Sequence, residues 1–186
     1  MQEDLLISKC KNGDGEAFRH LMNIYKTRLY GYLFKFSNTK DFTEDLFQET
    51  LIKVWKGFKK YNHQQKFSSW LFTIAHNVAM DNLRSIKNNK TYTDLTIVEQ
   101  KLSSENLESK IIINETLEII NKTVEQLSNK QKTVFLLRQH GEMTFKEIAE
   151  AINEPLNTVI SHMHYAMKKI RKQIEIENEP RRTTAI

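Results

Sequence analysis

The 186-residue chain is poor in cysteine, proline and glycine, with one, two and five of these residues. The lone cysteine, Cys10, excludes an internal disulfide, and no other metal-ligating residue lies near it at ligand spacing. Long apolar runs are absent, and the opening Met-Gln-Glu-Asp lacks the basic and apolar parts of a signal peptide. We therefore expect a cytoplasmic protein without membrane insertion.

Catalytic motifs are also missing. The sequence has no phosphate-binding glycine loop, no nucleophile elbow and no pair of acidic residues in an apolar setting. His162 and His164 are two residues apart, so they point to different sides of a helix, and neither has a partner at metal-ligand spacing. We expect no enzymatic activity, no cofactor and no metal site.

Apolar residues recur at helical spacing along most of the chain, and no segment alternates apolar and polar residues for long. This pattern predicts an all-α protein. Helix ends are marked by Asn12-Gly13, by Asp14 as the cap of the next helix, and by Asp41 with Glu44 as a capping box. A fourth helix is expected from Ser68 to Lys87.

Charge is distributed in three blocks. Residues 1–90 hold 15 Lys and Arg against 9 Asp and Glu, residues 91–129 hold 3 against 7, and residues 130–172 hold 8 against 4. The resulting net charges of +6, −4 and +4 fit two nucleic-acid-facing modules separated by a segment that DNA would repel. Many soluble proteins have charge blocks of this size by chance, so charge alone leaves both interpretations open.

These patterns predict two helical modules. We expect a first module at residues 1–88, an acidic flexible linker at 89–114, a second module at 115–175 and a disordered tail at 176–186. In the second module, Ser128 should cap a helix that stops at Gly141, and a turn at Asn153-Glu154 followed by Pro155 should join the two helices of a helix-turn-helix. The second module would thus be a four-helix DNA-binding domain.

Three polar residues, Asp45, Gln48 and Glu49, share one side of the expected third helix. The segments Asp41 to Trp55 and Phe67 to Arg84 resemble the polymerase-binding and promoter-melting segments of bacterial sigma factors of the extracytoplasmic-function group, within the sigma-70 family. This resemblance implies a factor that binds core RNA polymerase and directs promoter recognition and DNA melting. Its partners would be core RNA polymerase, promoter DNA and an anti-sigma factor.

Carried over by position, the resemblance assigns polymerase binding to Asp45, Gln48, Glu49 and Trp55. The outer face of the fourth helix is predicted to carry small polar groups and cations, which can lie close to a phosphate backbone. The residues expected to contact the minus-ten element there are Lys66, Ser69, Trp70, His76, Asn77, Arg84 and Lys87.

The second half matches the family at the positions that hold the helix-turn-helix together but departs from it on the DNA face. Asn157, Ile160, His162 and Tyr165 stand where these sigma factors commonly have Gly, Lys, Arg and Arg. The same helix is similar to the recognition helix of response-regulator output domains, so a stand-alone helix-turn-helix regulator remains an alternative. The residues expected to contact the minus-thirty-five element are Thr158, Ser161, His162, Tyr165, Lys168, Lys169, Arg171 and Lys172.

Overall fold

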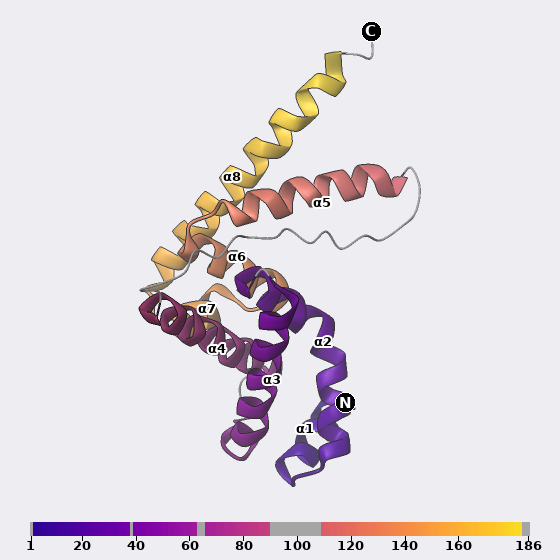
Figure 1. The fold of residues 1–186 in the computed structure, drawn as a ribbon, viewed down its shortest axis with the longest axis vertical. Coiled ribbons are helices and arrows are strands. Elements are labelled where there is room, and N and C mark those ends of the chain that lie inside the picture. The colour runs from indigo at the N-terminus through magenta and orange to yellow at the C-terminus, as the bar shows by residue number, and fades with distance from the viewer. Residues whose placement is uncertain (1, 38, 63–65, 90–108, 184–186) are drawn as a thin grey trace. The chain divides into compact units, whose positions relative to one another are not determined.

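The computed structural model describes residues 2–37, 39–62, 66–89 and 109–183. Over these residues the chain forms eight α-helices and one short 3-10 helix, without a β-strand (Figure 1). The all-α prediction is therefore confirmed. The chain divides into two compact units. The first contains helices α1 to α4 together with Gln139–Met143, and the second contains the rest of helices α5 to α8. Most of the predicted linker, residues 90–108, lies outside the described residues.

The first unit is built from α1 (Gln2–Lys11), α2 (Gly15–Ser37), α3 (Lys40–Gly57), a 3-10 turn (Phe58–Lys60) and α4 (Phe67–Asn89). Helix α1 ends as predicted, because Gly13 adopts the left-handed φ of 85° that glycine tolerates best. The Asp14 carboxylate accepts a hydrogen bond from the backbone N–H of Ala17 at 3.0 Å, which confirms it as the cap of α2.

The predicted cap of α3 is wrong. Thr39, not Asp41, is the N-cap: its backbone is extended, and its hydroxyl accepts a 3.4 Å hydrogen bond from the N–H of Phe42. A threonine hydroxyl can satisfy an unpaired N–H as an aspartate does, so the helix begins earlier than the acidic pair suggested. Asp41 instead lies in the first turn, where its charge favours the positive end of the helix dipole.

Helices α2, α3 and α4 pack against one another, and α1 packs on α2. Large side chains from α2, α3 and α4 are completely enclosed, and burial of this apolar area is the main force that holds the unit together. An aromatic cluster joins the end of α3 to the start of α4. The largest fully buried side chains of α2, α3, the 3-10 turn and α4 are Leu21, Leu29, Tyr32, Leu33, Leu46, Phe58, Leu71 and Phe72.

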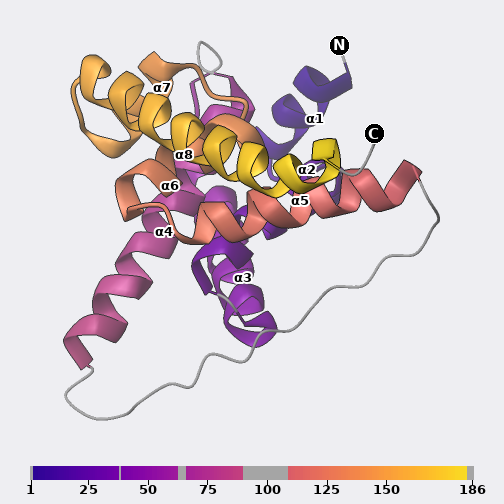
Figure 2. The same ribbon diagram turned by 90° about the horizontal axis from the view of Figure 1, so that it is seen from above.

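The second unit contains α5 (Ser109–Glu125), α6 (Asn129–His140) except its last two residues, α7 (Phe145–Ile152) and α8 (Leu156–Thr183). Figures 1 and 2 both show α5 lying alongside α8, and these two helices contact each other. Ser128 and Gln131 form a reciprocal cap at the start of α6, with distances of 3.3 and 3.4 Å, as predicted for Ser128. Helix α6 ends at His140, directly before Gly141.

Two predicted boundaries of this unit are wrong. Residues 109–114 belong to α5 and not to the linker, and residues 176–183 continue α8 where a disordered tail was expected. Residues 109–114 contain no glycine or proline, and Pro180 is the only such residue in 176–183. Once a helix has formed, each added residue gains a hydrogen bond at little cost, so a segment can extend the helix whatever its polarity.

The helix-turn-helix has the predicted turn. Thr144 and Glu147 form a capping box at the start of α7, and Asn153 ends that helix in the left-handed conformation with a φ of 53°. Pro155 directly precedes α8, where its missing N–H is not needed. The turn therefore positions α8 as the second helix of the pair.

Candidate nucleic-acid interface and partner surface

The exposed side of α3 is half polar and half apolar. Asp45 and Gln48 are exposed, as predicted, and one turn further on Ile52 and Trp55 are 53% and 39% exposed. These four residues, which we call the α3 stripe, follow helical spacing along one side. Sequence reasoning missed Ile52, although its distance of seven residues from Asp45 was a usable signal.

Glu49 was predicted to belong to this surface but is tied to its own unit. Its carboxylate accepts a 2.8 Å hydrogen bond from the side-chain amide of Asn82 in α4 and pairs with Lys53 at 2.9 Å. The pKa of Glu49 is lowered, chiefly by the hydrogen bond from Lys53, against an opposing effect of burial. Glu49 therefore joins α3 to α4 and offers a partner only part of its carboxylate.

Trp55 is held in place by its neighbours although much of it is exposed. Its ring meets Phe18 of α2 edge to face, with centroids 5.0 Å apart. Edge-to-face contacts of this kind orient an aromatic ring as well as burying it. The indole is thus a rigid, half-exposed group at the end of the α3 stripe.

Trp70, near the start of α4, packs into the aromatic cluster at the base of the preceding loop. Its ring centroid lies 4.8 Å from Tyr61, 5.5 Å from Phe58 and 5.7 Å from Phe67. Lys66, the described residue just before α4, is exposed, and its carbonyl accepts the N–H of Trp70 at 3.2 Å. The two predicted residues therefore lie together at the loop, Trp70 as part of its support and Lys66 at its surface.

Two residues expected on the outer face of α4 are instead buried. Ser69 and His76 are only 6% and 7% exposed, so the predicted face was placed wrongly at both positions. His76 Nδ1 lies 3.1 Å from the hydroxyl of the fully buried Tyr32, and burial is the main cause that lowers the pKa of His76 to about 4. A neutral imidazole paired with a tyrosine fits a structural role.

The error at His76 has a simple physical origin. Phe72 and Ala79 are completely buried on the same side of α4, so the buried arc of this helix is wider than one apolar stripe. The spacing Phe72, His76, Ala79 was a signal that a polar residue lay within an apolar row. Asn77 and Arg84 are exposed as expected, and the side chain of Lys87 lies outside what the structure describes.

Helix α8 presents several of the predicted DNA-contacting side chains. Ser161 and Tyr165 are exposed and Thr158 is half-buried, while Leu156 and Ile160 are 44% and 43% exposed. The Ser161 hydroxyl donates to the Asn157 carbonyl at 2.9 Å, so its proton is already engaged within the helix. Four exposed cations follow on the same helix: Lys168, Lys169, Arg171 and Lys172.

Two other predicted DNA contacts are engaged within the second unit. The Lys169 ammonium donates to the Gln126 carbonyl at 2.6 Å, which satisfies an acceptor at the end of α5. His162 is only 21% exposed, and its Nε2 lies 3.3 Å from Glu154, which also pairs with Lys130 at 2.6 Å. The hydrogen bond from Lys130 is the main cause that lowers the pKa of Glu154. Lys169 thus braces the fold, and His162 is mostly covered beside Glu154.

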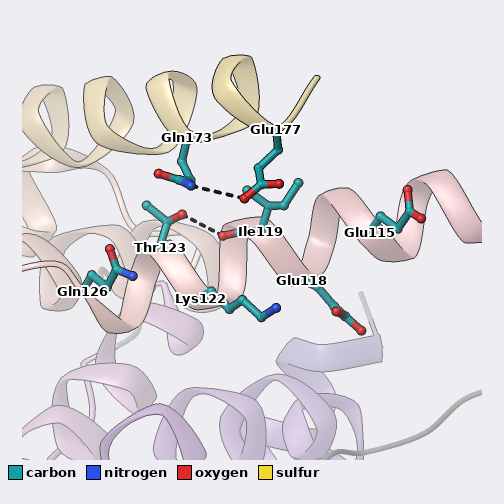
Figure 3. Close-up of a pocket in the computed structure, with 8 residues that line it drawn as sticks. All are labelled: Glu115, Glu118, Ile119, Lys122, Thr123, Gln126, Gln173 and Glu177. Atoms are coloured by element: carbon teal, nitrogen blue, oxygen red, sulfur yellow. Dashed lines mark hydrogen bonds between the residues drawn. The ribbon is translucent and has the colours of Figure 1, made fainter. Parts of the chain in front are cut away.

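A shallow pocket of about 420 Å³ lies between α5 and α8 (Figure 3). Its polar groups largely serve the helices themselves: Gln173 donates to Glu177 at 3.5 Å, and the Thr123 hydroxyl donates to the Ile119 carbonyl at 2.7 Å. Among the described residues, no group of three or more His, Cys, Asp or Glu could hold a metal ion. Nor is any helix in the described ranges long and apolar enough to cross a membrane.

Comparison with known proteins assigns both units to family models. Residues 21–89 match the model for sigma-70 region 2, and residues 117–170 match the model for sigma-70 region 4. These ranges contain the α3 stripe, α4 and the helix-turn-helix. The two modules that the sequence predicts therefore each have a family counterpart.

Curated relatives match over almost the whole chain. The chain is 29% identical to the ECF RNA polymerase sigma factor SigW of Bacillus subtilis, over 90% of this chain and 94% of that protein. It is 25% identical to the RNA polymerase sigma-H factor of Pseudomonas aeruginosa, over 94% of each chain. The fold is similar to that of the sigma factor RpoE of Bartonella quintana, solved with the anti-sigma factor NepR, with a TM-score of 0.67, 18% identity and coverage of 86% of this chain and 97% of that chain.

Proposed function

The chain belongs to the extracytoplasmic-function group of the sigma-70 family, and we propose that it binds core RNA polymerase and directs promoter recognition and DNA melting at initiation. The observation that carries this function is the presence of region 2 and region 4 in one chain. A stand-alone helix-turn-helix regulator would account for the second unit alone. It is not favoured, because the relatives match both units.

We propose that the α3 stripe is the polymerase-binding surface. Ile52 and Trp55 supply exposed apolar area, and Asp45 and Gln48 supply polar groups that set orientation. Aromatic anchors flanked by polar residues are typical of the energetically dominant part of protein interfaces. Glu49 contributes mainly by holding α3 against α4 through Asn82.

We propose that promoter DNA runs along the exposed part of α4. Asn77 and Arg84 are exposed there, and Lys66 lies at the loop that leads into the helix. An aromatic cluster at the loop base, with Trp70 in it, would keep the loop in place when strands separate. Ser69 and His76 are buried, so they are not among the proposed contacts.

The second unit is proposed to dock on the upstream promoter element through α8. Its exposed cations Lys168, Arg171 and Lys172 would neutralise phosphates, and side chains nearer the start of the helix would meet base edges. Catalysis would belong to the polymerase. Because its proposed partners are the bacterial polymerase and promoter DNA, the protein would act in the cytoplasm.

Regulation by an anti-sigma factor is a further part of the proposal. The structure of the Bartonella quintana sigma factor includes such a partner, and that sigma factor has a similar fold. A protein that covers the α3 stripe would prevent polymerase binding without any change in the sigma factor itself. Competition between the two partners for this surface is the expected mechanism.

Reconstitution tests the proposed function directly. The purified chain is mixed with core RNA polymerase and genomic DNA from the same bacterium, and transcript starts are mapped by sequencing. We expect starts that share two spaced sequence elements and that are absent when the chain is left out. Specific binding of the chain to duplex DNA as a free dimer, without any effect on polymerase starts, would instead support the stand-alone regulator.

A further inference from the structure

The first turns of α8 carry exposed apolar side chains where a DNA-reading helix meets base edges. Leu156 and Ile160 are 44% and 43% exposed, and at four residues apart they are neighbours on one side of the helix. The buried seam of α8 is formed by Val159 and Ala166, both at 0% exposure. Ile160 follows Val159 by one residue, about 100° around the helix, so it lies off that seam.

The geometry of the turn brings this end of α8 to the groove. In a helix-turn-helix the second helix enters the major groove, and its N-terminal residues contact the base edges. Asn153 and Pro155 make the short turn from α7, so Leu156 and Ile160 lie at the reading end of α8. DNA is the favoured occupant of this surface, since exposed Lys168, Arg171 and Lys172 follow on the same helix.

The chemistry of the groove restricts what an isoleucine can recognise. In the major groove guanine, adenine and cytosine present hydrogen-bonding groups, and thymine adds a C5-methyl group. Ile160 has no donor or acceptor, so it would strip water from a polar base edge without replacing the lost hydrogen bond. Contact with a thymine methyl buries apolar area on both sides and has no such cost.

We propose that Ile160, with Leu156 beside it, selects thymine at one or two adjacent positions of the upstream promoter element by packing against C5-methyl groups. This inference rests on the proposed function of the second unit in promoter binding. It identifies Ile160 as a specificity-determining residue, and it explains how a helix without cations at its reading end can still choose a sequence. The cations further along α8 supply attraction that is independent of sequence.

The test uses the full chain bound to core RNA polymerase. Promoters are first selected from a library randomised in the upstream region, and each thymine of the selected element is then replaced by uracil, which lacks only the methyl group. Loss of one methyl contact should weaken binding about fourfold at one or two positions and leave the others unchanged. With the Ile160→Ala variant, thymine and uracil promoters should bind equally well at one of those positions at least.

Ile176→Ala is the matched control, because Ile176 is also exposed, at 48%, and lies about 24 Å further along the same helix. It should keep the fourfold preference for thymine. Each comparison of thymine with uracil is made on one variant, so any loss of folded protein cancels from the ratio.

The outcomes separate this inference from the proposed function. A chain that directs no specific transcript starts with core polymerase overturns the proposed function, and this inference with it. Specific starts combined with an upstream element that contains no selected thymine overturn this inference alone. So does equal binding of thymine and uracil by the unmodified chain, or a fourfold preference that persists at every such position in Ile160→Ala.

Discussion

Gly57, at the end of α3, directly faces the indole of Trp70 in α4. A Cβ atom on Gly57 would lie 2.9 Å from Cζ2 of Trp70, closer than carbon atoms normally approach. The absence of a side chain at Gly57 therefore allows the end of α3 and the start of α4 to meet. The Trp70 ring has little room to move away from an added methyl, because it packs against Phe58, Tyr61 and Phe67.

We expect Gly57→Ala to destabilise the protein by about 1–3 kcal/mol, the usual cost of an added methyl in a packed region. Urea unfolding followed by helical circular dichroism measures this. Gly15→Ala is the matched control, because Gly15 also belongs to a helix and a methyl there meets no other part of the protein within 4 Å beyond its chain neighbours and the adjacent helix backbone. The stability of the Gly15→Ala variant should be unchanged or slightly higher. Equal stability of Gly57→Ala and the unmodified chain would contradict the close packing described here.

Trp55→Ala is expected to weaken binding to core polymerase. Truncating a central aromatic anchor typically costs about 2 kcal/mol or more, so the dissociation constant should rise roughly 30-fold. Titration of labelled protein with core polymerase measures the change. Ile24→Ala, which removes a 54% exposed apolar side chain from α2, is the control and should bind as before.

Asp45 and Glu49 should respond differently to substitution. Asp45→Ala removes an exposed carboxylate and should weaken polymerase binding without changing stability. Glu49→Ala removes the partner of Asn82 and Lys53, so some loss of stability is expected as well. Chemical denaturation, measured beside the binding titration, distinguishes the two variants. A loss of stability in Asp45→Ala would contradict the exposed position of Asp45 on the α3 stripe.

His76 makes stability depend on pH. Its folded pKa of about 4 lies below the usual 6.5, so between these values the unfolded chain binds more protons than the folded one. The free energy of unfolding should therefore rise with pH across this window and fall on acidification, by up to about 3 kcal/mol at pH 4. His76→Asn keeps an acceptor for the Tyr32 hydroxyl and does not titrate, so its stability should vary less with pH. An unchanged pH profile in this variant would exclude His76 as the cause.

Ile160→Lys should strengthen DNA binding and make it more sensitive to salt. One additional phosphate contact steepens the slope of log affinity against log salt by about 0.9. The measurement is a salt titration of polymerase carrying the variant sigma factor on a fixed promoter. Ile176→Lys adds the same charge further along α8, so a larger gain for Ile160→Lys would identify the reading end, and equal gains would indicate only a general effect of charge.

Local features of this protein followed from the sequence alone. Gly13, Asp14, Ser128 and the turn at Asn153 were predicted correctly, because a cap or a left-handed residue depends on neighbours a few positions away. The all-α class followed from apolar spacing for the same reason. The extent of α5 and of α8 did not follow from the sequence, since helix extension depends on small differences in free energy that composition does not reveal.

Tertiary structure decided which polar side chains remain available to a partner. The sequence favoured a surface role for Glu49, His76 and Lys169. Each side chain instead has a partner elsewhere in its unit: Asn82 on α4, Tyr32 on α2 and the carbonyl of Gln126 just after α5. Helical spacing tells which residues share a side of one helix, but not how wide an arc its neighbours cover. A polar group near that arc gains more from an internal hydrogen bond than it loses by leaving water, and only the packed helices bring such partners within reach.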